Sequence, residues 1–246
     1  ENLRKQNETL EKIAQTLFKH WFIDFEFPNA DGQPYKSSGG EMVRSELGDI
    51  PAGWRVEKFR ELGELNRGKS KYRPRYAEHL YGGIYPFIQT GDIKESKGFI
   101  TEYKQTYSEA GFAQSRLWNK ETLCITIAAN VAETGILTFQ SCFPDSIIGF
   151  SADSNICDVY FVHRAFICKR QEIEAKAIGS VQKNLNLKTI EDITFCIPPL
   201  TVYKELIDLF RKFGKRIENN KKQIQTLTQT RDTLLPQLMS GKLRIP

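Results

Sequence analysis

Cysteine and histidine are scarce: the 246-residue chain has 5 Cys and 3 His. The intervals between the cysteines match no zinc pattern, and the histidines stand apart from them. Most of the cysteines lie among Ile, Phe and Val, as buried thiols do. These features argue against a metal site and favour a reducing cytoplasm. The cysteines are Cys124, Cys142, Cys157, Cys168 and Cys196.

Long apolar runs and enzyme motifs are also lacking. No run approaches the length of a membrane span, and no signal-peptide pattern opens the chain. No GxGxxG, Walker A, HExxH, GxSxG or paired CxxC motif is present. The CIPPL at 196–200 loosely resembles the Asn-Pro-Pro-aromatic signature of amino-methyltransferases, but Ile197 takes the place of the Asn. We therefore interpret Pro198 and Pro199 as the entry to a helix, and expect no catalytic residue.

The middle of the chain lacks an excess of either charge. Residues 49–200 carry 19 basic and 18 acidic side chains, a net of +1, against −2 for residues 1–48 and +6 for residues 201–246. On this neutral background, RGKSKYRPRY (67–76) places a cation at every second position, with Tyr72 on the opposite side of an extended chain. Such a strip suits DNA phosphates, but it is also typical of a sheet edge protected against other strands. Gly68 and Pro74 favour a flexible arm along phosphates. The cations are Arg67, Lys69, Lys71, Arg73 and Arg75.

Three further stretches carry polar groups suited to nucleic acid: QTGDI (89–93), AANVAETG (128–135) and SVQKNLNLKTI (180–190). Amides and carboxylates bond base edges, and lysines bond phosphates. Each stretch also has a structural interpretation: a plain turn in which Asp92 bonds its own backbone, a hairpin turn, and a solvated strand edge. The candidate contacts are Gln89, Thr90, Asp92, Lys94, Asn130, Gln182, Lys183 and Asn184.

Helical patterns flank this middle region. Residues 1–22 repeat Leu every seven positions, and the pattern ends before Pro28. Residues 201–235 form a longer helix, which Thr201 could cap. Its apolar positions step by four and three, as in a coiled-coil seam interrupted by Asn220 and Arg231. We expect the two helices to pair antiparallel, with interface residues Leu10, Leu17, Phe210, Phe213, Ile217, Ile224, Leu227, Leu234 and Leu238.

The middle region is predicted to be α+β, with a mostly antiparallel or mixed sheet. We expect strands in 82–93, 121–139, 155–169 and 189–199, an amphipathic segment within 47–65, and a short helix over 170–180. The predicted domains are a helical region (1–27), an exposed linker (28–48), a globular domain (49–200) and a distal helix (201–246). Residues 8–18 match 225–235 at four positions, so we expect a tandem unit of domain and helix.

Taken together, these stretches resemble the specificity subunit of Type I restriction-modification systems. The resemblance rests on NETLEKIAQTLFKHWFIDFE, LGDIPAGWRVEKF, IYPFIQTGDI, LCITIAANVAETGILTF, FPDSIIGF, GSVQKNLNLKTIEDITFCIPPL and TLLPQLMSGKLRI, which occur in the family's order and span nearly the whole chain. One departure is that Gly68 is followed by KSKYRPRY, where a Thr-Pro pair is common. Individual contact residues are therefore not fixed by the resemblance.

The resemblance implies a non-catalytic, prokaryotic, cytoplasmic subunit. In this family a target recognition domain reads one half of a split DNA site in the major groove, and the helices act as a spacer. The helices also dock methyltransferase subunits, which supply S-adenosylmethionine, and motor-nuclease subunits supply ATP and Mg. The chain is expected to be one recognition domain with its flanking helices, either an excised part or a half-subunit that dimerises. A coiled-coil protein scaffold and a degenerate methyltransferase are the rival hypotheses.

Overall fold

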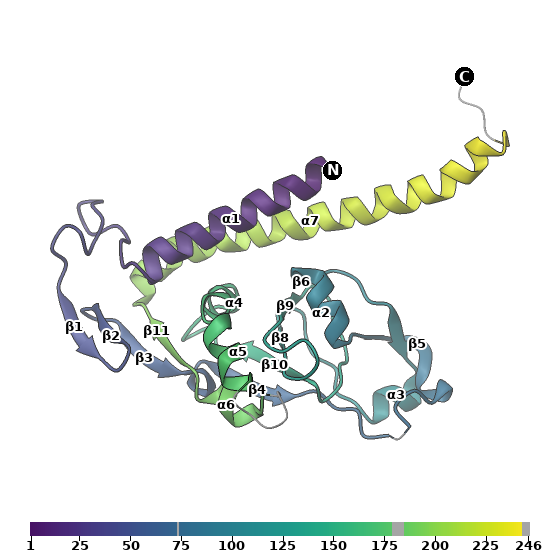
Figure 1. The fold of residues 1–246 in the computed structure, drawn as a ribbon, viewed down its shortest axis with the longest axis horizontal. Coiled ribbons are helices and arrows are strands. Elements are labelled where there is room, and N and C mark those ends of the chain that lie inside the picture. Colours follow the sequence, from purple (N-terminus) through teal and green to yellow (C-terminus); the bar gives the residue numbers. More distant parts are fainter. Residues whose placement is uncertain (73, 179–184, 243–246) are drawn as a thin grey trace.

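Two long helices pack together along one side of the molecule. The structure, a computed structural model, describes residues 1–72, 74–178 and 185–242. Helices α1 (Asn2–Phe22) and α7 (Leu200–Met239) contact each other and run in opposite directions, with most of the rest of the chain below them in Figure 1. The predicted antiparallel pair is confirmed. The described part of the chain has no helix long and apolar enough to cross a membrane.

The boundaries of α7 differ from the predicted ones at both ends. Pro199 is the N-cap and the helix begins at Leu200, so the prediction that Thr201 caps it is wrong. A proline at the cap fits because that position needs no intrahelical N–H bond. At the other end the helix continues beyond residue 235, through Pro236, to Met239.

The predicted mixed sheet is confirmed. It has five strands in the order β4 (Gly63–Arg67), β10 (Ile147–Ala152), β8 (Leu123–Thr126), β9 (Thr134–Leu137) and β6 (Gly98–Ile100). Neighbouring strands are antiparallel except β6 and β9, which are parallel. The β8–β9 hairpin is the one predicted within 121–139.

Short strand pairs extend the domain at both ends (Figure 1). They are β1 (Met42–Ser45) with β2 (Gly48–Pro51), β3 (Arg55–Lys58) with β11 (Thr194–Ile197), and β5 (Tyr81–Phe87) with β7 (Gln105–Tyr107). The region predicted as an exposed linker (28–48) is mostly exposed but contains regular structure. The β1–β2 hairpin occupies its second half, and Tyr35 stacks on Phe27 with ring centroids 4.6 Å apart. Residues 47–65, predicted to contain a turn and a short amphipathic segment, include β2, β3, the 3-10 helix η1 (Phe59–Glu61) and the start of β4.

Short helices complete the domain. The helix predicted over 170–180 is confirmed over its described residues as α5 (Arg170–Ile178). The strand predicted over 155–169 is wrong, because Val159–Cys168 is helix α4. Almost every side chain of α4 is buried, so its apolar residues show no one-sided period that distinguishes helix from strand. The Asp158 carboxylate caps it by accepting a 2.8 Å hydrogen bond from the Tyr160 N–H. The other helices are η1 (Phe59–Glu61), η2 (Glu78–Leu80), α2 (Thr90–Ser96), α3 (Glu109–Ala113), α5 (Arg170–Ile178) and α6 (Leu187–Glu191).

One apolar core joins the helix pair to the domain. Phe18 of α1 is 1% exposed, and its ring centroid lies 5.4 Å from that of Phe161 in α4 and 6.1 Å from that of Phe210 in α7. The same cluster of buried residues continues to the strand residues Leu123 and Ile136. The helices are therefore packed against the domain through their apolar sides.

Candidate nucleic-acid interface

One end of the five-stranded sheet gathers several connections. Ile148 of β10 lies opposite both Arg67 of β4 and Ile125 of β8, and Ile125 lies opposite Thr134 of β9. Strands β4 and β8 therefore end at the same edge of the sheet at which β9 and β10 begin. Strand β6 also begins there, since it runs parallel to β9. The described segments that meet at this end are 68–72, 74–77, 127–133, 144–146 and the C-terminal end of α2.

The basic stretch leaves the sheet at this end, but it is not a one-sided strip. Strand β4 ends at Arg67, and Ser70 within the stretch is buried. Gly68 lies so close to Phe143 and Pro144 that an added Cβ would be 2.3 Å from the Pro144 carbonyl oxygen. After Arg67 the described residues of this stretch form a loop, as Gly68 and Pro74 indicated, and the loop packs against 143–145 instead of continuing β4.

Asp145 holds two of the predicted cations. The Nε of Arg67 donates to the Asp145 carbonyl at 2.9 Å, and the Arg75 guanidinium donates to both carboxylate oxygens at 2.9 and 3.1 Å. Lys69 and Lys71 are exposed, and neither forms an ion pair with any described residue. Arg67 and Arg75 thus brace the segment, while the two lysines are available to a polyanion.

Residues 114–118, which were not predicted to belong to the site, lie next to the basic stretch and form hydrogen bonds with it. The Tyr72 N–H donates to Gln114 Oε1 at 2.7 Å, and the Ser115 hydroxyl donates to the Lys69 carbonyl at 2.9 Å. Arg116 follows, with its guanidinium carbon 4.0 Å from the centre of the Trp118 ring. The only signal in the sequence was the spacing of Arg116 and Trp118. That spacing does not indicate a site unless the two side chains are known to be in contact.

The stretch 89–94 closely follows β5, as predicted, but residues 90–94 belong to helix α2 and not to a loop. Gln89 is the N-cap of α2, and Thr90 is its first residue. The Asp92 carboxylate accepts the Gln89 N–H at 2.8 Å, the local backbone bond named as the structural alternative, and it lies 3.7 Å from Lys104 Nζ. Base contacts by these side chains stay a prediction.

Two predicted residues that are distant in sequence do come together. Lys94 Nζ lies 3.4 Å from Asn130 Oδ1, so the end of α2 meets the connection between β8 and β9. That connection is a tight turn in which Ala129 and Ala132 have φ of 63° and 62°, in the left-handed region. Both the hairpin-turn interpretation and the DNA-contact prediction for Asn130 remain compatible with this geometry.

The rest of the predicted polar set lies partly outside the described residues. Those outside them are Arg73, Gln182, Lys183 and Asn184. Leu185, the next described residue, donates its N–H to the Ile127 carbonyl at 3.1 Å, at the end of the sheet defined above. The alternative interpretation of 180–190 as a solvated strand edge does not hold for 187–190, which lie in α6 with Asn186 as its cap.

The predicted helix interface is present over the first part of α7. Phe210 and Ile217 are buried, whereas Leu10, Leu17 and Phe213 are partly buried against the core. Asn220 is 1% exposed, and its Nδ2 donates to Asn7 Oδ1 of α1 at 2.8 Å. A buried polar pair of this kind fixes the register of two helices.

The distal part of α7 is not covered in this way. Leu227 is 62% exposed and Leu234 is 38% exposed, whereas Ile224 and Leu238 are intermediate. An interface at these positions stays a prediction, and within the described residues they present an apolar seam to solvent.

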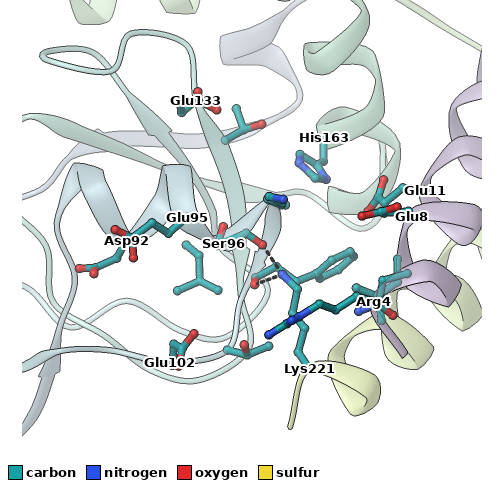
Figure 2. A pocket seen from close by; sticks show the side chains of 18 of the residues that line it. Arg4, Glu8, Glu11, Asp92, Glu95, Ser96, Glu102, Glu133, His163 and Lys221 are labelled. Atoms are coloured by element: carbon teal, nitrogen blue, oxygen red, sulfur yellow. Dashed lines mark hydrogen bonds between the residues drawn. The ribbon is translucent and has the colours of Figure 1, made fainter. Parts of the chain in front are cut away.

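A cleft of about 750 Å³ separates the helix pair from the edge formed by α2 and β6 (Figure 2). Lys221 of α7 crosses it and donates to the Ser96 carbonyl and, at 2.9 Å, to the Phe99 carbonyl. On the other side, Arg164 of α4 forms a hydrogen-bonded ion pair with Glu11 of α1. These charged contacts, which the sequence did not indicate, fix the domain against the helices.

Burial lowers the pKa of Lys221 from 10.5 to about 8, against the opposing effects of Glu11 and Glu102. Lys97 lowers it further. The folded chain therefore loses the Lys221 proton at a lower pH than the unfolded chain does. Between about pH 8 and 10.5 the free energy of unfolding of the wild type should rise relative to that of Lys221→Met. Below pH 8 the difference should be constant. Urea unfolding of both proteins at pH 7 to 10 measures it.

Subtracting the free energy of unfolding of Lys221→Met from that of the wild type removes the contribution of every other titratable group, because the two proteins share those groups. Lys222→Met on the exposed side of α7 is the matched control, and its difference from the wild type should stay flat with pH. Parallel stability curves for wild type and Lys221→Met would contradict the buried position of Lys221.

The chain is an α+β domain flanked by helices, with loops gathered at one end of its sheet. Residues 51–229 match the family described as "Type I restriction modification DNA specificity domain", and the chain belongs to this family.

Curated relatives carry matching names. The "Type I restriction enzyme MjaIX specificity subunit" of Methanocaldococcus jannaschii is 28% identical over 100% of this chain and 55% of its own length. The HindI specificity subunit of Haemophilus influenzae is 24% identical over 96% of this chain and 62% of its own length. The chain thus spans about half the length of the curated relatives it matches.

Solved structures share the fold. The S subunit of a Type I system from M. genitalium superposes with a TM-score of 0.63 at 16% identity, over 95% of this chain and 55% of that one. The HsdS subunit from Thermoanaerobacter tengcongensis gives 0.55 at 14% identity, over 98% and 53%. At these identities the likeness establishes the fold alone.

Proposed function

We propose that this chain is a DNA-recognition unit of a Type I restriction-modification complex and reads one half of a bipartite target in the major groove. The observation that carries the proposal is that the segments with exposed Lys69 and Lys71 and those with Lys94 and Asn130 meet the sheet at the same end. Lysines neutralise phosphates, and amides bond base edges, so one loop cluster supplies both kinds of contact. The family membership of residues 51–229 supports the same conclusion.

The proposed role is non-catalytic. Methylation would be carried out by methyltransferase subunits that bind S-adenosylmethionine, and cleavage by motor subunits that use ATP and Mg. The α1–α7 pair would serve as a spacer and docking element for the methyltransferase. The exposed seam at Leu227 and Leu234 supports this, because a solvent-facing coiled-coil seam is a surface for a further helix. That helix would come from the remainder of a longer subunit or from a second copy.

Removing a phosphate contact should weaken the salt dependence of DNA binding. Lys69→Ala and Lys71→Ala are each expected to reduce the slope of log K against log salt by about 0.9, and the double variant by about 1.8, because each released lysine leaves one phosphate unneutralised. Fluorescence anisotropy of a labelled duplex at several salt concentrations measures the slope. The protein should be assembled with its methyltransferase subunit.

Lys36→Ala is the matched control, since Lys36 is also exposed but lies before β1, outside the loop cluster. Its slope should equal that of the wild type. If Lys69→Ala and Lys71→Ala have the same slope as Lys36→Ala, the basic stretch does not touch DNA, and the scaffold hypothesis is favoured.

A further inference from the structure

An exposed isoleucine stands on a bulge beside the basic stretch. Ile84 of β5 is 79% exposed, whereas nearly all large apolar side chains of the described domain are at least partly covered. Both Tyr81 and Tyr85 lie opposite Tyr107 of β7, so residues 82–84 have no partner and project from the pair. A bulge of this kind re-aims a side chain and is frequent near functional sites.

Glycines make the bulge possible. Gly82 has φ of 83°, in the region that favours glycine. Gly83 passes so close to β7 that an added Cβ would lie 2.4 Å from the Tyr107 carbonyl oxygen. Any side chain at Gly83 would push the strands apart, so the sequence YGGIY specifies a bulge with Ile84 as its only projecting side chain.

Aromatic packing holds the base of the bulge rigidly. Tyr107 is fully buried and stacks on Phe87 at 4.1 Å. Tyr85 stacks on Phe112 at 4.2 Å, with an interplanar angle of 12°, and its hydroxyl donates to the Glu109 carboxylate at 2.9 Å. Isoleucine is itself stiff at χ1. An exposed apolar side chain on so rigid a base has little conformational freedom to lose when it binds.

The bulge is tied directly to the basic stretch. The Tyr81 hydroxyl donates to the Arg75 carbonyl at 2.9 Å, and the Ser108 hydroxyl donates to the His79 carbonyl at 2.6 Å. His79 in turn meets the Tyr72 ring edge-on at 5.0 Å. The base of the bulge and the basic stretch are therefore in direct contact, and Ile84 projects from the strand that the basic stretch packs against.

From this position we infer that Ile84 contacts the 5-methyl group of one thymine in the major groove, and that it selects thymine at that position of the target. An isoleucine has no donor or acceptor, so the base feature it can read is the thymine methyl group. The inference rests on the proposed function and names one of its base contacts. An apolar wedge between base steps, typical of the minor groove, is the contrasting possibility.

Uracil substitution tests the contact, because it removes only the methyl group. The wild-type chain, assembled with its methyltransferase subunit, is first used to select its half-site from randomised duplexes. Each thymine of that half-site is then replaced by uracil, and Kd is measured by anisotropy. At one position the wild type should bind about fourfold more weakly, the effect of one buried methyl group. Ile84→Ala should bind thymine and uracil duplexes at that position equally.

Val43→Ala on β1 is the control, since Val43 is 39% exposed and lies outside the loop cluster. It should keep the wild-type response to uracil. The inference is overturned by a selected half-site without thymine, by no uracil effect at any position, or by Ile84→Ala weakening thymine and uracil duplexes to the same extent, as a wedge would. A complex that selects no sequence at all overturns the proposed function itself.

Discussion

Replacing Phe18 by alanine is expected to lower the free energy of unfolding by about 3–5 kcal/mol, the cost of removing a buried aromatic ring and leaving a cavity. Phe18 is 1% exposed, and its ring lies 4.9 Å from Phe22, 5.4 Å from Phe161 and 6.1 Å from Phe210. These rings come from α1, α4 and α7, so one side chain joins the helix pair to the domain. Urea denaturation followed by circular dichroism measures the loss.

Thr16→Ala, an exposed position on the same helix, serves as the control and should change stability by less than about 0.5 kcal/mol. Because the helix pair and the domain share one core, the circular dichroism of the helices and the tryptophan signal should also change together in one unfolding transition. A Phe18→Ala protein as stable as the control would show that α1 is not packed against the domain in the way described.

Breaking the ion pair between Arg164 and Glu11 is expected to cost about 3 kcal/mol. The Arg164 side chain is 5% exposed and that of Glu11 is 22% exposed. Arg164→Met would leave the Glu11 carboxylate desolvated without its partner, which is the strongly destabilising way to break a buried pair. Glu11 Oε1 already has no hydrogen-bond partner among the described residues, so it cannot offset the loss.

The double variant Arg164→Met with Glu11→Leu separates this effect from simple loss of packing. It should recover most of the stability, because neither charge is then buried alone. Lys222→Ala is the control, since its i,i+4 pair with Glu218 is solvent-exposed on the lysine side and should cost less than about 0.5 kcal/mol. If the two single losses simply add in the double variant, Arg164 and Glu11 are not paired.

Local periodicity explains which parts of the fold could be predicted. The heptad spacing of Leu10 and Leu17 and the seam through Phe210 and Ile217 predicted both helices, because each has one buried face. Helix α4 could not be predicted in this way, since it is buried on nearly all sides and rich in β-branched and aromatic residues. Residues 28–48 resembled a linker through their Gly, Pro and Ser content, yet Tyr35 and the β1–β2 hairpin give them a fixed structure.

The candidate interface was predictable only in part, for a related reason. Charge spacing identified Lys69 and Lys71, and amide content identified Asn130. Which cations are free depends on contacts between distant segments: Asp145 holds Arg67 and Arg75, 78 and 70 residues away in sequence. The same applies to Lys221, whose place in the cleft is set by Ser96 and Phe99, and to Ile84, whose exposure follows from its pairing with β7.

The most direct test of the central claim is selection from randomised DNA duplexes by the chain assembled with its methyltransferase subunit. The account predicts enrichment of one defined half-site, and it predicts that Lys69→Ala/Lys71→Ala weakens binding to all duplexes while leaving that half-site unchanged, since phosphate contacts position rather than specify. Enrichment of no sequence, or of the same sequence by the methyltransferase alone, would contradict the claim that this chain reads DNA.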